Sequence, residues 1–139
     1  MQLATMIDVA DRLRLDLSGL EADGFPVSVV CTPLPNSVQE RLPCCWIRML
    51  GGTRGSVVID EATLTLHAYA ATWPQACDVA SLLHARCMQL PYDPDAQTDW
   101  KAVNTIGLPY EDPDPDHPSI PRYSFSIGVT VKAVVTDPS

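Results

Sequence analysis

The glycine-rich stretch at residues 51–56 is the first place where residue types suggest chemistry. It reads GGTRGS, and a glycine-rich loop beside a cation can cradle phosphate groups. The stretch lacks the G-x-x-x-x-G-K-[ST] pattern, and it joins two predicted strands instead of opening a helix. We therefore predict a mobile hairpin loop in which Arg54 is free to contact a partner protein or passing DNA phosphates. The candidate contact residues are Gly51, Gly52, Thr53, Arg54 and Gly55.

The acidic segment EDPDPDHP is the second group of residues that could bind something. Carboxylates are calcium ligands, but the spacing differs from an EF-hand loop and the turn glycine of that loop is missing. Residues 109–121 contain five prolines, which favour an extended loop over a helix or a strand. We predict a solvated loop that binds no metal and whose acidic side chains contact a partner. These side chains are Glu111, Asp112, Asp114 and Asp116.

The histidines and cysteines do not form a catalytic or zinc-binding pattern. We predict His67 on the wet face of a strand, His84 on the outer side of a helix and His117 in the acidic loop. No serine or cysteine sits in a G-x-S-x-G elbow, and neither C-x-x-C nor a Cys/His zinc spacing occurs. The five cysteines are odd in number and follow no secretory signal, so we expect reduced thiols. We expect no enzymatic activity, no catalytic residue, no cofactor and no metal.

Composition narrows the classes of partner. The chain has 139 residues, which suits one domain, 1–139, with a real core. Its net charge of −8 repels nucleic acid at long range and argues against a sequence-specific DNA or RNA binder. The same negative charge is compatible with a protein that lines a channel through which DNA passes without binding. No apolar run is long enough to cross a membrane, so we expect no membrane partner.

Two long segments alternate apolar and polar residues and predict the central strands. They are residues 121–135 and 57–71, each with one buried and one wet face. A strand of roughly 14 residues spans about 45 Å at 3.3 Å per residue. A compact domain of this length is roughly 37 Å across. The strands must therefore bend or project, and a projecting β-hairpin is a way for one subunit to reach another.

The remaining elements complete an α+β fold. We predict a mostly antiparallel sheet with two α-helices packed on one face, because hairpin connections dominate. Thr72 and Gln75 predict a capping box that begins the second helix, Pro74 is tolerated in its first turn, and Pro91 ends it. The other predicted elements are a helix at 2–17, strands at 26–31, 44–50 and 100–108, a turn or loop at 36–42, a loop at 109–121 and a frayed tail at 136–139.

The assembled pattern resembles the tail terminator (tail completion) proteins of long-tailed bacteriophages, particularly those of actinobacterial phages. The likeness covers roughly residues 2–133. It rests on the strand-turn LP…WIRMLGG, the segment GLPYEDPD, the closing strand PRYSFSIGVTVKA, and a strand-to-helix junction. The residues of that junction are Asp60, Ala62, Leu64, Leu66, Ala68, Tyr69, Ala70, Thr72 and Ala76. These are packing patterns and contain no catalytic fingerprint.

The resemblance implies a structural virion protein. Such a protein has a sheet backed by helices and forms a hexameric ring at the tail–neck junction, after assembly in the host cytoplasm. The ring caps the tube built by the major tail tube protein, stops its polymerisation and offers a docking surface to the head-completion or neck protein. Genomic DNA later passes through the central hole. No catalytic residue is carried over.

Three other interpretations stay open. The chain could be another neck or head-closure component, because monomer folds there can be similar. It could be a small soluble enzyme or ligand-binding α+β domain, which predicts a deep pocket with convergent polar groups. It could also be an adaptor whose long hairpin binds partners by strand addition.

Overall fold

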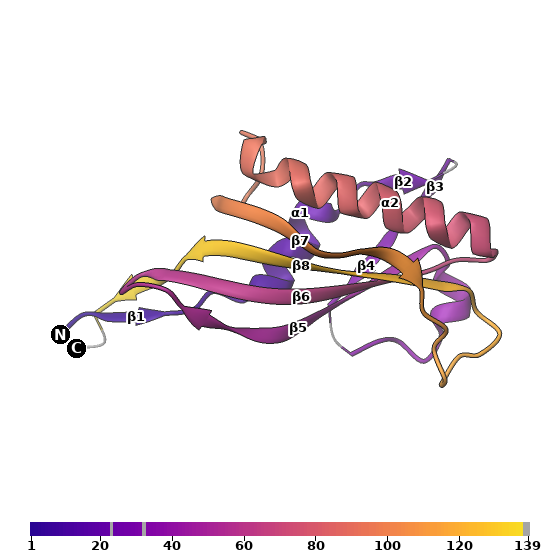
Figure 1. Ribbon diagram of the computed structural model, residues 1–139, viewed down its shortest axis with the longest axis horizontal. Coiled ribbons are helices and arrows are strands. Elements are labelled where there is room, and N and C mark those ends of the chain that lie inside the picture. Colours follow the sequence, from indigo (N-terminus) through magenta and orange to yellow (C-terminus); the bar gives the residue numbers. More distant parts are fainter. Residues whose placement is uncertain (23, 32, 138–139) are drawn as a thin grey trace.

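The computed structural model describes residues 1–22, 24–31 and 33–137, and it is elongated along its sheet (Figure 1). The described residues confirm the predicted α+β class, with two α-helices and a mostly antiparallel sheet. The helices are α1 (Val9–Leu17) and α2 (Trp73–Gln89), and the 3-10 turns are η1 (Val38–Arg41) and η2 (Leu90–Tyr92). The strands are β1 (Leu3–Thr5), β2 (Glu21–Ala22), β3 (Phe25–Pro26), β4 (Ser28–Val30), β5 (Cys44–Arg54), β6 (Ile59–Tyr69), β7 (Trp100–Glu111), β8 (Arg122–Lys132) and β9 (Val134–Thr136).

The main sheet has the order β4–β5–β6–β8–β7. Only β4 runs parallel to its neighbour, and it pairs with no more than the first part of β5, from Cys44 to Trp46. In the described chain, the rest of β5 therefore pairs with β6 alone, and β7 pairs with β8 alone. The sheet has two free borders, one along β7 and one along the second half of β5.

One face of the sheet carries both helices, as predicted. Side chains at alternate positions of β6 and β8, such as Leu64, Leu66 and Ile127, pack with Leu13 of α1 and Leu83 of α2 in one buried cluster. Each of these side chains is fully buried, so each contributes about 1.5–3 kcal/mol through apolar surface removed from water. The Thr72 hydroxyl accepts a hydrogen bond from the Gln75 N–H at 3.2 Å, which confirms the predicted start of α2.

The other face is covered at one end and open at the other. The turn η1 and the segment after β7 close over the end that holds Tyr69, where Val38, Cys44, Tyr69 and Ile120 form a second buried cluster. Beyond that cover, the sheet presents a row of hydroxyl side chains, which we call the hydroxyl face. Its residues are Thr53, Thr63, Thr65, Ser126 and Thr130, all at least partly exposed.

The predicted helix at 2–17 is wrong in its first half. Residues Leu3–Thr5 form β1, which pairs antiparallel with β9, and the helix begins only at Val9. The Asp8 carboxylate caps it by accepting a hydrogen bond from the Asp11 N–H at 3.2 Å. Pairing between distant segments overrides the local helical period here. The same pairing corrects the predicted frayed tail at 136–139, because Thr136 belongs to β9; residues 138 and 139 lie outside the described residues.

Several predicted boundaries also shift. The strand predicted at 26–31 is divided into β3 and β4, and the long strands β6 and β8 have 11 residues each, shorter than predicted. The hairpin of β5 and β6 still reaches the far end of the molecule, where it lies beside β1 and β9 (Figure 1). The acidic loop after β7 lies at the opposite end (Figure 1).

Candidate interaction surface

Residues 51–54 belong to strand β5, so the loop predicted over 51–56 is wrong for these four residues, whereas Gly55 and Ser56 do lie in the turn that leads to β6. Pairing with β6 continues to Arg54 opposite Asp60, and it is interrupted by a bulge between Met49 and Gly51. Gly51 has a φ of 111°, a conformation that glycine adopts at little cost. A Cβ added at Gly52 would overlap the Glu61 carbonyl oxygen. The glycines therefore shape a bulged strand and do not supply flexibility.

Arg54 is engaged within the chain. Its Nε and Nη2 donate to the two Asp60 carboxylate oxygens at 2.5 and 2.9 Å, and Nη1 donates to the Ala4 carbonyl oxygen at 2.9 Å. The hydrogen bond from Arg54 lowers the pKa of Asp60. The Arg54 side chain thus ties β1 to the end of the β5–β6 hairpin, and its charge is compensated locally.

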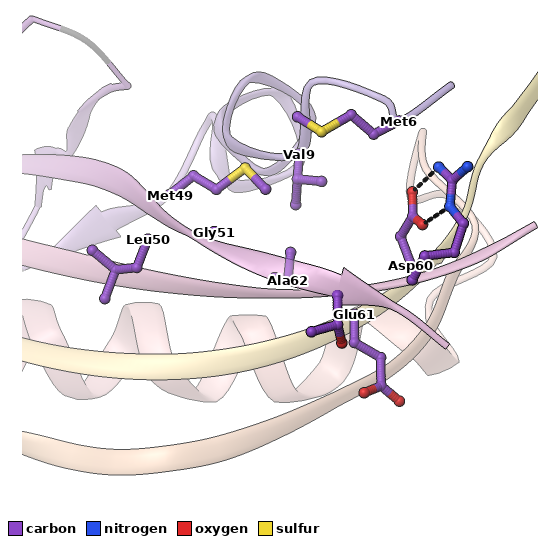
Figure 2. Close-up of a pocket in the computed structure, with 11 residues that line it drawn as sticks. Met6, Val9, Met49, Leu50, Gly51, Asp60, Glu61 and Ala62 are labelled. Carbon is purple, nitrogen blue, oxygen red and sulfur yellow. Dashed lines mark hydrogen bonds and ion pairs between the residues drawn. The ribbon is translucent and has the colours of Figure 1, made fainter. Parts of the chain in front are cut away.

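An apolar groove lies along this part of β5, beside α1. It has a volume of about 700 Å³ and is lined mainly by apolar side chains. Figure 2 shows Met6, Val9 and Met49 converging on one side of the strands, while Glu61 points to the opposite side. We call this hollow the β5 groove; its lining residues are Met6, Val9, Met49, Leu50, Gly51, Gly52, Thr53, Arg54, Asp60, Glu61 and Ala62.

The acidic segment is not the fully solvated loop that the sequence predicts. Glu111 is the last residue of β7, and Asp114 is buried. The Asp114 carboxylate accepts hydrogen bonds from the Tyr69 hydroxyl at 2.6 Å and from the Asp116 N–H at 3.0 Å, and His117 Nδ1 lies 3.0 Å away. Burial alone would raise the pKa of Asp114, but these hydrogen bonds and the Arg122 charge bring it down to about 2.

Arg122 fixes the loop to the sheet, and sequence reasoning missed it. Its Nε donates to the Asp112 carbonyl oxygen at 2.6 Å, and its Nη2 lies 3.0 Å from the Asp112 carboxylate. Nη1 donates to the Tyr69 hydroxyl oxygen at 3.3 Å. An arginine at the first position of a strand that follows a run of aspartates was the available signal, because a buried carboxylate needs a paired cation.

His67 is buried, so the predicted wet position is wrong. Its Nδ1 lies 2.6 Å from Ser124 Oγ and 3.8 Å from an Asp112 carboxylate oxygen, while Nε2 is buried with no hydrogen-bond partner in the described chain. In a Ser-His-Asp triad the serine and the carboxylate bind opposite ring nitrogens, whereas here both approach Nδ1. Ser124 is also fully buried and out of reach of a substrate. The three residues therefore form a structural cluster.

The remaining histidines and the buried cysteines Cys44 and Cys87 show no catalytic arrangement in the described chain. His84 lies on the side of α2 that faces β7, not on the outer side, because its Nε2 is 2.7 Å from Thr105 Oγ1. His117 lies in the acidic loop, as predicted. Burial raises the pKa of Cys44 to about 11 and that of Cys87 to about 12, which keeps both thiols protonated at neutral pH. Among residues 1–22, 24–31 and 33–137, no group of His, Cys, Asp and Glu side chains is arranged to hold a metal ion.

The two predicted contact groups lie at opposite ends of the sheet. The segment 51–55 borders the β5 groove at the hairpin end, and the acidic loop lies at the other end (Figure 1). Sequence reasoning did not find the exposed apolar side chains of β7. Ile106, Leu108 and Tyr110 are 56%, 68% and 55% exposed on this free border of the sheet. We call these three residues the β7 strip.

Comparison of the sequence with protein-family models and with curated proteins finds no match. None of the helices in the described chain is long and apolar enough to span a membrane.

Proposed function

We propose that this chain is a tail terminator protein of a long-tailed bacteriophage, a subunit of a ring that caps the tail tube and joins it to the neck. The free border along β7 carries the proposal. This edge of 12 residues pairs only with β8 in the described chain and bears the apolar β7 strip. A contiguous line of exposed apolar side chains at a sheet border is typical of a surface that contacts another protein. Closed association between copies covers such an edge without making filaments.

The separation of the two ends of the molecule also supports the proposal. A terminator needs one surface for the tube end and another for the neck protein. The β5–β6 hairpin with the terminal strands β1 and β9 forms one end, and the acidic loop, held by Arg122, forms the other (Figure 1). The Arg122 and Tyr69 contacts hold the loop in place, which lowers the entropy cost of binding a partner there.

The hydroxyl face suits a conduit for DNA. Affinity for the DNA backbone comes chiefly from Lys and Arg side chains that neutralise phosphates. Thr63, Thr65, Ser126 and Thr130 carry no charge, and the Thr65 and Ser126 hydroxyl oxygens lie 2.9 Å apart, hydrogen-bonded to each other. The same face also carries Arg48, opposite Thr65, and Glu61, opposite Thr130, so a cation and a carboxylate stand among these hydroxyls and the face offers few strong phosphate contacts. The chain's net charge of −8 further discourages adhesion of DNA.

Electron microscopy of the purified chain with tail tubes tests the function. The tubes are assembled from the tube protein of the same phage, and their lengths are measured with and without the chain. The expected result is density at one end of each tube and an arrest of further tube growth. Density along the tube walls, or no binding at all, contradicts the proposal. Binding to the neck protein without binding to tube ends favours another head-closure component.

A further inference from the structure

The β5 groove and the β7 strip lie at opposite borders of one sheet. The groove follows the second half of β5, beyond the part that β4 covers. The strip lies on β7, separated from β5 by β6 and β8. Adjacent strands lie about 4.8 Å apart, so the two borders are roughly 14 Å apart across the sheet. A contact between the two surfaces therefore joins different copies of the chain.

Both surfaces carry little charge in a strongly acidic chain. Residues 102–110, which include the β7 strip, contain no Asp, Glu, Lys or Arg. The charges that border the groove are the Arg54–Asp60 ion pair, which is neutral as a pair, and Glu61, which points to the other side of the strands (Figure 2). Two copies with a charge of −8 each repel one another, so surfaces with little charge are where they can approach. Depletion of charge also marks the centre of protein interfaces.

The groove is hollow, and the strip consists of side chains that project from the sheet border. The groove is concave and contains Met6 and Met49, whose flexible thioether side chains adapt to an incoming side chain. The strip is a line of side chains that stand out from a border, with Leu108 at 68% exposure. Two members of the strip, Ile106 and Tyr110, lie on the face of the sheet that carries no helix. Ile106 lies beside Asn104 and Gly128 on that face, and Tyr110 is opposite Ser124.

The backbone of β7 favours a side-chain contact over regular strand addition. Its pairing with β8 shifts register between Thr105 and Gly107 and again between Gly107 and Tyr110. Pro109 lies in this stretch and has no N–H to donate. Bulges and proline are features that protect sheet edges from continuous pairing. Neighbouring sheets would therefore overlap at their borders, with the open face at β7 laid over the helix side at β5.

We propose that the β7 strip of one copy packs into the β5 groove of the next, so that copies associate head to tail. This contact rests on the proposed ring-forming function and names the surfaces that build the ring. The interface is heterologous, because each copy offers a different surface to each neighbour. Repetition with a suitable rotation closes a ring, and each copy then uses both of its surfaces.

The contact is tested with two single variants and their mixture. The measured quantity is the molar mass of the protein in solution, which gives its oligomeric state. Met6→Glu places a charge in the groove, and Leu108→Glu places one on the strip; both side chains are exposed at 59% and 68%, so neither change disturbs the core. The wild type is expected to form a closed oligomer at raised concentration. Each variant alone is expected to stay monomeric, with association weakened roughly tenfold or more.

The mixture of the two variants gives the decisive result. Met6→Glu retains a wild-type strip and Leu108→Glu retains a wild-type groove, so one intact contact forms and a 1:1 heterodimer is expected without larger species. The control is Tyr92→Glu, which changes a side chain that is 85% exposed and lies outside both surfaces; it is expected to associate like the wild type. A monomeric wild type, unaffected association in either variant, or a mixture that stays monomeric overturns the contact.

The same variants separate this contact from the proposed function. If the wild-type chain associates through the two surfaces but does not bind tube ends, the function is wrong and the contact stands. If the chain binds tube ends, and Met6→Glu and Leu108→Glu bind them as well as the wild type does, the contact is wrong and the function stands.

Discussion

The Tyr69 hydroxyl donates a hydrogen bond of 2.6 Å to Asp114, a residue 45 positions later in the chain. Tyr69 is fully buried at the end of β6, and Asp114 is the buried member of the acidic loop. The contact explains why a segment with many prolines and aspartates has a defined position over the sheet. Hydrogen bonds from Tyr69, Asp116 and His117, together with the nearby Arg122 charge, keep the Asp114 carboxylate ionised.

Replacing Tyr69 with Phe should loosen the acidic loop without opening the core. The ring is retained, but the buried Asp114 carboxylate loses a donor, which costs about 1–3 kcal/mol of the free energy of unfolding. Urea denaturation gives that value, and amide exchange of residues 112–120 should become faster. Tyr110→Phe is the matched control, because the Tyr110 side chain is 55% exposed. Equal stability of the two variants would show that the contact is energetically unimportant.

Stability should fall between pH 6.5 and pH 4 because of His67. Burial, followed by the charge of Arg122, lowers its pKa to about 4 from the ordinary value of 6.5. The folded state holds the neutral ring, so the contribution is complete above pH 6.5 and is lost as pH falls through the folded pKa. A shift of this size corresponds to at most about 3 kcal/mol. Urea denaturation at several pH values measures the slope.

His67→Gln provides the control for this pH dependence. Glutamine keeps a polar side chain near Ser124 but does not titrate, so the slope between pH 6.5 and pH 4 should become smaller. Asp114 contributes little in this window, because the stability linked to its lowered pKa is lost mainly between the ordinary value of 3.8 and the folded value of about 2. An unchanged slope in His67→Gln would assign the acid sensitivity to other groups.

Gly52→Ala should be much more destabilising than Gly55→Ala. A Cβ at Gly52 overlaps the backbone of Glu61, whereas one at Gly55 comes no closer than 3.9 Å to the Ile59 carbonyl oxygen. Overlap with backbone atoms forces the strands apart, at a cost of about 1–3 kcal/mol. Thermal and urea denaturation of the two variants test this, and similar midpoints would contradict the close approach of β5 and β6 at Gly52.

Arg54→Ala should release β1 from the hairpin. The variant loses the hydrogen bond to the Ala4 carbonyl oxygen and the ion pair with Asp60. Hydrogen exchange at residues 3–5 and 134–136 should become faster, while exchange in β6 and β8 stays slow. Arg48→Ala is the matched control, because that guanidinium lies over the Trp46 ring, 5.0 Å from its centroid, and does not touch β1. Unchanged protection of β1 would show that the β1–β9 pairing is sufficient without Arg54.

The sequence was most informative where local chemistry and tertiary structure agree. Thr72 caps α2 as predicted, although the Gln75 side chain accepts from the Ala71 N–H and not from the Thr72 N–H of a capping box. The alternation in β6 and β8 also predicts the face that packs on the helices, which carries Leu64, Leu66 and Ile127. Both signals are local: a cap satisfies the N–H groups of one turn, and a strand half-buried by a helix layer alternates with period two.

The errors arose where distant segments meet. His67 and Tyr69 occupy the positions that alternation assigns to solvent, yet η1 and the acidic loop cover that end of the sheet. Leu3 lies in the helical period of α1 but pairs with Thr136 across the chain. Alternation also does not reveal which strand becomes a border, so the exposed Ile106 and Leu108 were not singled out. Each of these outcomes is decided by a partner that is remote in sequence.

Strand order in the main sheet has a consequence for synthesis on the ribosome. β8 lies between β6 and β7 in space but follows both in the chain. Until residues 122–132 emerge, the nascent β5–β6 hairpin and β7 have no inner neighbour, and Leu64 and Leu66 lack Phe125 and Ile127 beside them. The nascent chain therefore exposes unpaired, aggregation-prone strands until β8 emerges, and holdase chaperones should associate with it during that interval.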